Sequence, residues 1–432
     1  MADDADVGTD VDAGRDTDAR SPVVSTGGGA RTDGGAAAAG PTFTDLDWDE
    51  YDGSGFLVTR TTVAFVGSLL ALFALFLYDY LFVPKGLLLV GSWNPTVLDW
   101  LSLFSAIVLT FYVVVPLASS PRLTKRYGRE LLAQPGAKLS LAYLGLFVLA
   151  AALGPEVWGG PENAPLWTEL RVRGEPSSLP PFWDSTGMAG RNWCPTGVVD
   201  GRCHGTTIHP LGTTVRGYDV LAFLLTGARL ALKVVVITAV ILVPIATVVG
   251  SVAAYFGGRV DAVLMRYVDF QQAIPAFIAY FMIQFVYEAS VVALVLLFGL
   301  LDWDRVARRV RNDASRRSDA GYVVAAESAG ASRFDVIRRH LVPNVSGTIV
   351  AGLTTQIPFI LVMEATFSYL GVVDASTDSW GSAIAAGLSA GGSFDWWAFL
   401  FPALMLVCTA YAINHLGNAI YEVLQPHQRI EE

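Results

Sequence analysis

Long apolar stretches alternate with polar connections along the chain, and this pattern predicts membrane-spanning helices. A helix of about twenty apolar residues crosses the hydrocarbon core of a bilayer, so each stretch near that length is interpreted as one span. Two shorter stretches lie between about 271 and 302, and dividing them at Tyr287 and Glu288 gives two further spans. The predicted fold is an all-α polytopic membrane protein with about eight transmembrane helices. The longer spans cover about 62–83, 98–119, 139–155, 230–254, 345–370 and 397–420.

Positively charged residues orient these spans, because cytoplasmic loops are enriched in lysine and arginine. The connection between the second and third spans holds Arg122, Lys125, Arg126, Arg129 and Lys138, and segment 303–343 holds nine arginines. Placing both segments in the cytoplasm puts 156–219 and roughly 372–395 outside, and it puts both termini inside. We expect tryptophans near span ends to lie at the membrane interfaces. These are Trp303, Trp380, Trp396 and Trp397.

Composition separates the first fifty residues from the rest of the chain. The whole sequence is 53% hydrophobic and 16% charged, with a formal charge of −10, yet residues 1–50 alone hold twelve acids and only three arginines. This Gly-, Ala- and Asp-rich opening lacks the apolar content needed to offset the entropy of ordering. It also lacks the basic start and apolar run of a signal peptide. We predict a disordered acidic cytoplasmic tail over 1–55, and no nucleic-acid surface.

The outer segment 156–219 contains Cys194 and Cys203, which could form a disulfide in an oxidising space. The sequence does not decide whether they are bridged. His204 and His209 lie nearby, but the spacing matches no familiar zinc pattern, so we predict no metal site. Cys408 lies in an apolar span and is interpreted as a core residue.

Within the arginine-rich segment, residues 322–344 predict a helix, a break and a second helix. Gly330 can take the left-handed conformation that ends a helix. Ser332 and Asp335 have the spacing of a capping box, and Pro343 is expected to stop the second helix. Alanines give the first helix a small-residue surface that permits close approach of another protein; they are Ala325, Ala326 and Ala329. The expected product is a compact elbow on the cytoplasmic face.

This elbow resembles the signature of ABC importer permeases, in which Glu-Ala-Ala is followed by a glycine and a final Leu-Pro. Ala325, Ala326, Gly330 and Pro343 match at the required spacing, whereas Val324, His340 and Val342 depart from it. Further stretches are similar, in order, to the C-type permease of dipeptide/oligopeptide (nickel) importers, and the resemblance covers about 205–428. They include the segments that begin at His209, Gly217, Tyr255, Glu364, Ser379 and Asn414.

The resemblance implies a coupling role for the elbow, against a groove of a cytoplasmic ATPase subunit. The residues it assigns to ATPase coupling are Ala325, Ala326, Glu327, Gly330, Ala331, Ser332 and Pro343. It also implies a second permease subunit, two ATPase subunits and an extracellular substrate-binding protein as partners. No phosphate-loop motif is present, so we predict no enzyme activity, no catalytic residues and no cofactor, with ATP bound by the partner subunits.

Composition, the predicted spans and the resemblance together divide the chain into four parts. They are the tail 1–55, three N-terminal transmembrane helices over 56–155, the extracellular loop 156–219, and the permease domain 220–428 with its coupling loop 303–343. The predicted function is to form the translocation path for di- or oligopeptides. Nickel or oligosaccharide cargo remains an alternative, and an ion-coupled secondary transporter is a weaker one because it needs no elbow.

Two ionisable residues stand out within the spans, because a charge in hydrocarbon is costly unless it is paired or faces a cavity. Lys233 is placed near a span end, where its side chain could reach the interface. Glu364 lies deeper, beside Thr366 and Ser368. Hydrogen bonding between helices is the favoured interpretation of Glu364, and lining the substrate path is the alternative.

Overall fold

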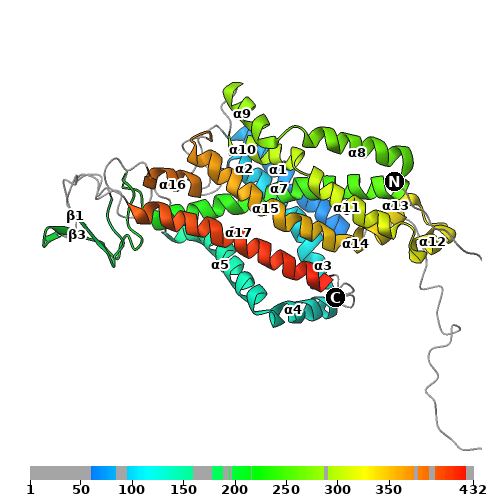
Figure 1. The fold of residues 1–432 in the computed structure, drawn as a ribbon, viewed down its shortest axis with the longest axis horizontal. Coiled ribbons are helices and arrows are strands. Elements are labelled where there is room, and N and C mark those ends of the chain that lie inside the picture. The colour runs from blue at the N-terminus through cyan, green and yellow to red at the C-terminus, as the bar shows by residue number, and fades with distance from the viewer. Residues whose placement is uncertain are drawn as a thin grey trace, which may run out of the picture. The chain divides into compact units, whose positions relative to one another are not determined.

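The computed structural model describes residues 60–83, 95–158, 178–187, 194, 197–215, 217–286, 290–373, 378–388 and 395–424. Most of these residues are helical, and the long helices run roughly side by side (Figure 1). Six helices are long and apolar enough to cross a membrane, and each coincides with one of the six longer predicted spans. The predicted all-α polytopic fold is confirmed. The predicted tail 1–55 lies outside the described residues.

Three spans precede the long outer segment. The first is α1 (Arg60–Phe82), and none of its residues is buried. The second is continuous from Val97 to Ser119, formed by α2 (Val97–Leu109), η3 (Thr110–Val114) and α3 (Val115–Ser119). The amphipathic α4 (Pro121–Ala133) then leads into α5 (Pro135–Trp158), which packs against α7 and α17.

The described part of the outer segment forms a small cap over the helix bundle. Its strands β1 (Ser185–Gly187), β3 (Arg202–His204) and β2 (Val198–Val199) form an antiparallel sheet with β3 in the centre. Cys194 and Cys203 are joined by a disulfide and are buried with Leu179. A hydrogen bond joins the cap to α17 (Trp396–Leu424): Trp397 Nε1 donates to the carbonyl of Thr213 (3.0 Å).

The helix α7 (Val220–Phe256) begins directly under this cap and continues for 37 residues. The Asp219 carboxylate accepts a hydrogen bond from the Ala222 backbone N–H (3.0 Å) and so caps the helix. The second carboxylate oxygen of Asp219 accepts a hydrogen bond from His209 Nδ1 (2.7 Å), and both side chains are buried. At about 1.5 Å per residue, α7 is about 55 Å long, which exceeds the thickness of a bilayer core.

The two predicted spans between 271 and 302 are shorter than expected. They form α9 (Ala276–Val286) and α10 (Val291–Leu301), with 11 residues each, and about 16 Å of helix cannot cross a core of about 30 Å. Each is extended by a polar helix, α9 by α8 (Gly258–Gln272) and α10 by α11 (Asp304–Arg317). These two bent rods pack against each other along both halves.

The predicted coupling loop 303–343 therefore does not begin as a loop. Its first part is α11, which packs against α7 through an apolar stripe while its arginines occupy the other faces. The stripe is buried and consists of Val306, Ala307, Val310 and Ala314. High arginine content hid this stripe in the sequence, because a narrow stripe of four small residues is enough to hold a helix against a neighbour.

After the elbow, the chain returns through α15 (Ser346–Tyr369), α16 (Trp380–Leu388) and α17. These helices approach one another closely at glycines. A Cβ on Gly381 would lie 1.9 Å from the Ala365 carbonyl oxygen, and a Cβ on Gly417 would lie 1.8 Å from the Thr354 side chain. Such close approach at small residues is the usual way that membrane helices pack.

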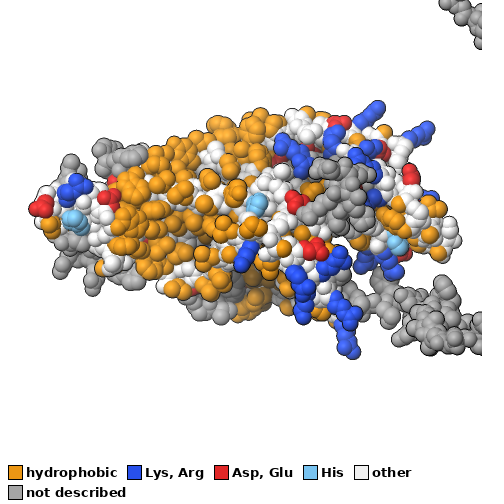
Figure 2. Space-filling model, turned by 60° about the horizontal axis from the view of Figure 1, so that its bottom comes forward, with side chains coloured by type: hydrophobic (Ala, Val, Ile, Leu, Met, Phe, Trp, Pro, Cys, Tyr) orange, Lys and Arg blue, Asp and Glu red, His pale blue; other side chains and the backbone are white. Residues whose placement is uncertain are grey.

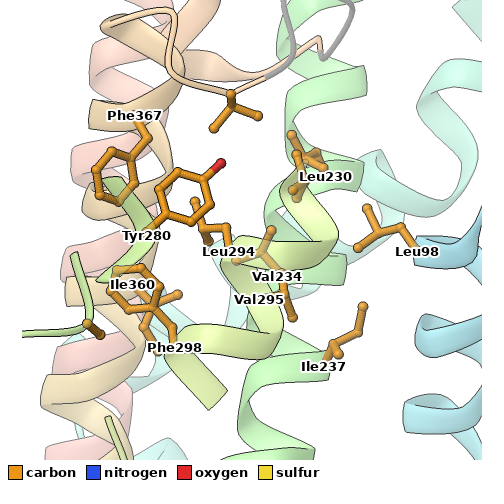
Figure 3. Packing of buried hydrophobic residues seen from close by; sticks show 13 residues of the cluster. Leu98, Leu230, Val234, Ile237, Tyr280, Leu294, Val295, Phe298, Ile360 and Phe367 are labelled. Atoms are coloured by element: carbon orange, nitrogen blue, oxygen red, sulfur yellow. The ribbon is translucent and has the colours of Figure 1, made fainter. Parts of the chain in front are cut away.

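The largest buried cluster lies where α7, α9, α10 and α15 meet. Figure 3 shows the ring of Tyr280 of α9 beside that of Phe367 of α15, and the two ring centroids are 4.8 Å apart. Leu98 of α2 reaches the same cluster from the other side, facing α7. The N-terminal helix pair is thus packed onto the rest of the bundle through α2.

On the face shown in Figure 2, hydrophobic side chains cover a broad band, and lysine and arginine side chains gather toward one end. The prediction that tryptophans near span ends are interfacial is wrong for three of the four. Trp303, Trp380 and Trp397 are buried inside the bundle. Their indole N–H groups donate to backbone carbonyls, including that of Leu224 on α7.

Candidate functional site

The elbow begins with α12 (Gly321–Ser328), and the chain after this helix closes a Schellman motif. Gly330 has φ = 85°, its N–H bonds to the Glu327 carbonyl (2.9 Å), and the N–H of Ala331 bonds to the Ala326 carbonyl (3.0 Å). These two bonds satisfy carbonyls that a helix end otherwise leaves free, and the positive φ explains why glycine occupies this position. The predicted end of the first helix is confirmed.

The second half of the elbow begins at Ser332, as the sequence indicates. The Ser332 hydroxyl accepts from the Asp335 backbone N–H (3.2 Å) and lies 2.5 Å from the Asp335 carboxylate. The helix continues through α13 (Arg333–Asp335), η4 (Val336–Leu341) and α14 (Val342–Asn344). It ends one residue after Pro343, and α15 follows at Ser346. The break after Pro343 is close to the predicted position.

The elbow is attached to the end of α7. Tyr255 donates a hydrogen bond from its hydroxyl to the Glu327 carboxylate (2.7 Å). The Arg333 guanidinium lies 5.7 Å from the centre of the Phe256 ring, within the range of a cation–π contact. Val336 is buried completely. These contacts join the elbow to the same helix that begins under the outer cap.

The face of the elbow that points away from the bundle is exposed and largely apolar or small. Val324 is 52% exposed and Phe334 is 69% exposed, and Ala325 is exposed beside them. In Figure 1, α12 lies at the far end of the unit, on the side of α11 and its arginines. An apolar face beyond the hydrophobic band cannot be covered by lipid tails, so this surface is suited to a protein contact.

The predicted coupling residues from Ala325 to Ser332 lie along α12 and the turn after it, whereas Pro343 lies at the far end of the second helical segment. Ala325, Glu327 and Gly330 are exposed, while Ala326 and Ala331 are half-buried against the rest of the elbow. The structure adds two residues that the sequence analysis did not assign, Tyr255 and Phe256. The sequence did contain a sign of them, because both residues lie in the segment beginning at Tyr255, which is similar to the C-type permeases.

Glu364 is buried in α15, where it accepts a hydrogen bond from Ser368 (2.9 Å). Its 3% exposure places it inside the bundle. Because the Ser368 bond lies within α15, hydrogen bonding between helices stays a prediction. Lys233 does not lie near a span end, because α7 begins at Val220 rather than near 230. It instead forms an ion pair with Asp99 of α2, with 2.5 Å between Nζ and Oδ1.

Within the described ranges, the remaining cysteines and histidines form no cluster of metal ligands. Among the described residues, no three His, Cys, Asp or Glu side chains come together in a way that could hold an ion. The Nδ1 atom of His209 is bonded to Asp219. Cys408 is exposed on α17, so the interpretation of it as a core residue is wrong. An apolar residue in a span can face lipid as readily as the core.

The fold and the elbow define a multi-pass membrane protein that presents a helix–turn–helix contact surface at its positively charged end. The family described as "Binding-protein-dependent transport system inner membrane component" matches residues 246–430. The chain belongs to this family, and it is a permease component of an ABC importer. The predicted resemblance is confirmed, and the family is one of transport permeases.

Two relatives show how far the similarity extends. The dipeptide transport system permease protein DppC of Bacillus subtilis is 32% identical over 222 residues, which are 51% of this chain and 69% of the relative. A putative peptide transport system permease protein of Brucella suis is 30% identical over 305 residues, which are 70% of this chain and 92% of the relative.

Proposed function

We propose that the chain forms one half of the translocation path of an importer for di- or oligopeptides. The observation that carries this proposal is the exposed elbow, which is held by the end of α7 and lies at the arginine-rich end of the bundle. Support for peptide cargo comes from the relatives, whose names describe dipeptide, oligopeptide and peptide transport.

The proposal requires four kinds of partner. They are a second permease, two ATPase subunits that bind the ATP, an extracellular substrate-binding protein and the surrounding lipid. The family description itself refers to dependence on a binding protein. The role of this chain is mechanical rather than chemical, because a partner that binds one arrangement of the helices better than another shifts the balance between them.

The arginine-rich end is assigned to the cytoplasm, together with both termini. The basic residues of α4, α8 and α11 support this orientation under the positive-inside rule. The cap that contains the Cys194–Cys203 disulfide then lies outside, where disulfides persist. The elbow would meet ATPase subunits in the cytoplasm, and the cap would meet the binding protein outside.

The test places a bulky side chain on the exposed face of the elbow. Ala325→Trp adds a large ring at an exposed position, so the bundle should still fold. We expect loss of the ATPase subunits from the purified assembly and at least a tenfold fall in substrate-stimulated ATP hydrolysis. Leu132→Trp is the matched control, because Leu132 is 50% exposed on α4.

Membrane insertion and the yield of monodisperse protein must be the same for both variants, so that a folding defect is recognised. If Ala325→Trp retains its ATPase subunits and normal coupled hydrolysis, the elbow is not the ATPase contact. If Leu132→Trp loses coupling to the same extent, the effect is not specific to the elbow.

A further inference from the structure

A tight turn in the outer cap presents two large aromatic side chains on the surface. The chain is buried from Ser178 to Pro181, and the next two residues, Phe182 and Trp183, are 52% and 53% exposed. Their rings meet edge to face, with 4.8 Å between the centroids. Large apolar groups that gather on a surface in this way mark a contact site for protein or membrane.

Backbone hydrogen bonds fix the direction of this turn. The N–H of Asp184 donates to the carbonyl of Pro181 (2.9 Å) and closes the turn. The N–H of Phe182 donates to the carbonyl of Pro210 (3.3 Å) in another part of the cap. Gly205 lies so close that an added Cβ would be 2.1 Å from the Pro181 oxygen. The two rings are therefore held in position by the cap itself.

The turn lies beside α17 rather than beyond its end. Figure 1 shows the cap at the end of the bundle where α17 begins. The ring of Trp183 is 6.2 Å from the ring of Phe401, edge to face. Because α17 begins at Trp396, this contact is about 7.5 Å along the helix from its start. The aromatic pair thus reaches the second turn of α17.

The start of α17 marks the edge of the hydrocarbon layer. The apolar part of this helix runs from Trp396 to Ile413, and polar residues begin at Asn414. At about 1.5 Å per residue this part extends about 27 Å, close to the thickness of about 30 Å of a bilayer core. Phe401 therefore lies just inside the core, and Trp183 lies at the level where the core meets the lipid headgroups.

The exposed side of α17 continues from this level into the hydrocarbon region. Leu404 is one turn beyond Phe401 and is 47% exposed, and Val407 and Tyr411 are 62% and 68% exposed further along. Lipid tails are the solvent for such residues on a spanning helix. Because Trp183 contacts Phe401, the aromatic pair extends this lipid-facing surface at the end nearest the cap.

We propose that Phe182 and Trp183 insert into the boundary between headgroups and hydrocarbon and anchor the outer cap to the bilayer. Tryptophan favours this depth because its ring has an apolar body and a polar N–H. The anchor adds a lipid contact to the hydrogen bond between Trp397 and Thr213 that joins the cap to α17. The inference goes beyond the proposed function, since it holds for any cargo and for either orientation of the chain.

The depth of the pair favours lipid over a soluble protein partner. Headgroups surround the helix at the level of Phe401, so a soluble protein would have to displace them to cover both rings. The residue after the pair, Asp184, is acidic, and its carboxylate accepts from the Trp396 indole N–H (3.3 Å) at the start of the helix. A polar surface therefore begins directly after the two rings, as it does at a membrane boundary.

Depth-dependent fluorescence quenching tests the insertion. Phe182→Cys, which leaves Trp183 in place, is labelled with a bimane probe in a Cys408→Ser background that keeps the disulfide of the cap. The full chain is reconstituted in vesicles of phosphatidylcholine and phosphatidylglycerol that carry a nitroxide at the headgroup, at acyl carbon 5 or at acyl carbon 12. The control is Val198→Cys, because Val198 of β2 is an equally exposed apolar residue of the same cap.

We expect the headgroup and carbon-5 nitroxides to quench the probe at position 182 at least three times more strongly than the probe at position 198. Equal quenching at the two positions would overturn the proposal, and so would strongest quenching by the carbon-12 nitroxide. Trp183→Cys supplies a second probe site if Phe182→Cys does not fold. Resistance of the cap cysteines to thiol reagents shows that the disulfide has formed in each variant.

Photocrosslinking in cells distinguishes lipid from a protein partner. Phe182 is replaced by benzoylphenylalanine in cells that express the whole importer, and the products are identified by mass spectrometry. We expect lipid adducts, with at least five times the yield of the same replacement at Val198. Crosslinks to a binding protein or to another copy of this chain in place of lipid would overturn the proposal. Neither result changes the recovery of ATPase subunits, so failure of the anchor leaves the proposed function standing.

Discussion

Removing the lysine of the Lys233–Asp99 pair should loosen the N-terminal helix pair from the bundle. The two side chains are 24% and 17% exposed, and the Asp99 carboxylate also accepts from the backbone and side chain of Thr96 (2.8 Å each). Lys233→Met leaves a carboxylate that keeps only the Thr96 bonds. Breaking one side of a buried pair costs about 3–5 kcal/mol. Because both side chains are partly exposed and the Thr96 bonds remain, we expect a loss near 3 kcal/mol.

The assay is reversible unfolding in mixed micelles with increasing dodecyl sulfate, followed by tryptophan fluorescence. Combining Lys233→Met with Asp99→Asn should restore stability to within about 1 kcal/mol of the native chain, because replacing both partners is often nearly neutral. Lys125→Met, at an exposed position on α4, is the control and should change stability by less than about 0.5 kcal/mol. A loss below 1 kcal/mol for Lys233→Met, or a double variant as unstable as the single one, would refute the reasoning.

Three further changes test local features. Gly381→Ala puts a Cβ 1.9 Å from a carbonyl oxygen of α15, so we expect it to lower the free energy of unfolding by about 1–3 kcal/mol, measured by thermal unfolding. The control is Gly145→Ala, whose added Cβ meets nothing within 4 Å and should leave stability unchanged or raise it. Gly330→Ala, at φ = 85°, should cost about 1–2 kcal/mol of elbow stability by hydrogen exchange, and Gly330→Asn less. Replacing Cys194 and Cys203 by serine should destabilise the cap by about 3 kcal/mol, measured by its rate of proteolysis.

Features set by neighbouring residues could be predicted from the sequence, and the elbow is the clearest example. Its helix end at Gly330 and its cap at Ser332 depend on hydrogen bonds between residues no more than five positions apart. The six long spans were predictable for a similar reason, since twenty consecutive apolar residues need no knowledge of the rest of the fold.

Features that depend on distant contacts were missed. Trp380 and Trp397 were assigned to the membrane interface because they lie near span ends, yet each donates to a carbonyl more than 150 residues away in the chain. The Lys233–Asp99 pair joins residues 134 positions apart. It was hidden because the apolar stretch of α7 was taken to begin ten residues late, which placed Lys233 at a helix end.

The length of α7 determines how the two ends of the protein are related. The helix begins where Asp219, held by His209, caps its first turn under the outer cap. It ends where Tyr255 and Phe256 hold the elbow. No residue within it leaves the helical conformation, although Pro244 removes one backbone hydrogen bond. The elbow and the outer cap are therefore joined through a single helix of 37 residues, whose one proline, Pro244, weakens the turn that precedes it.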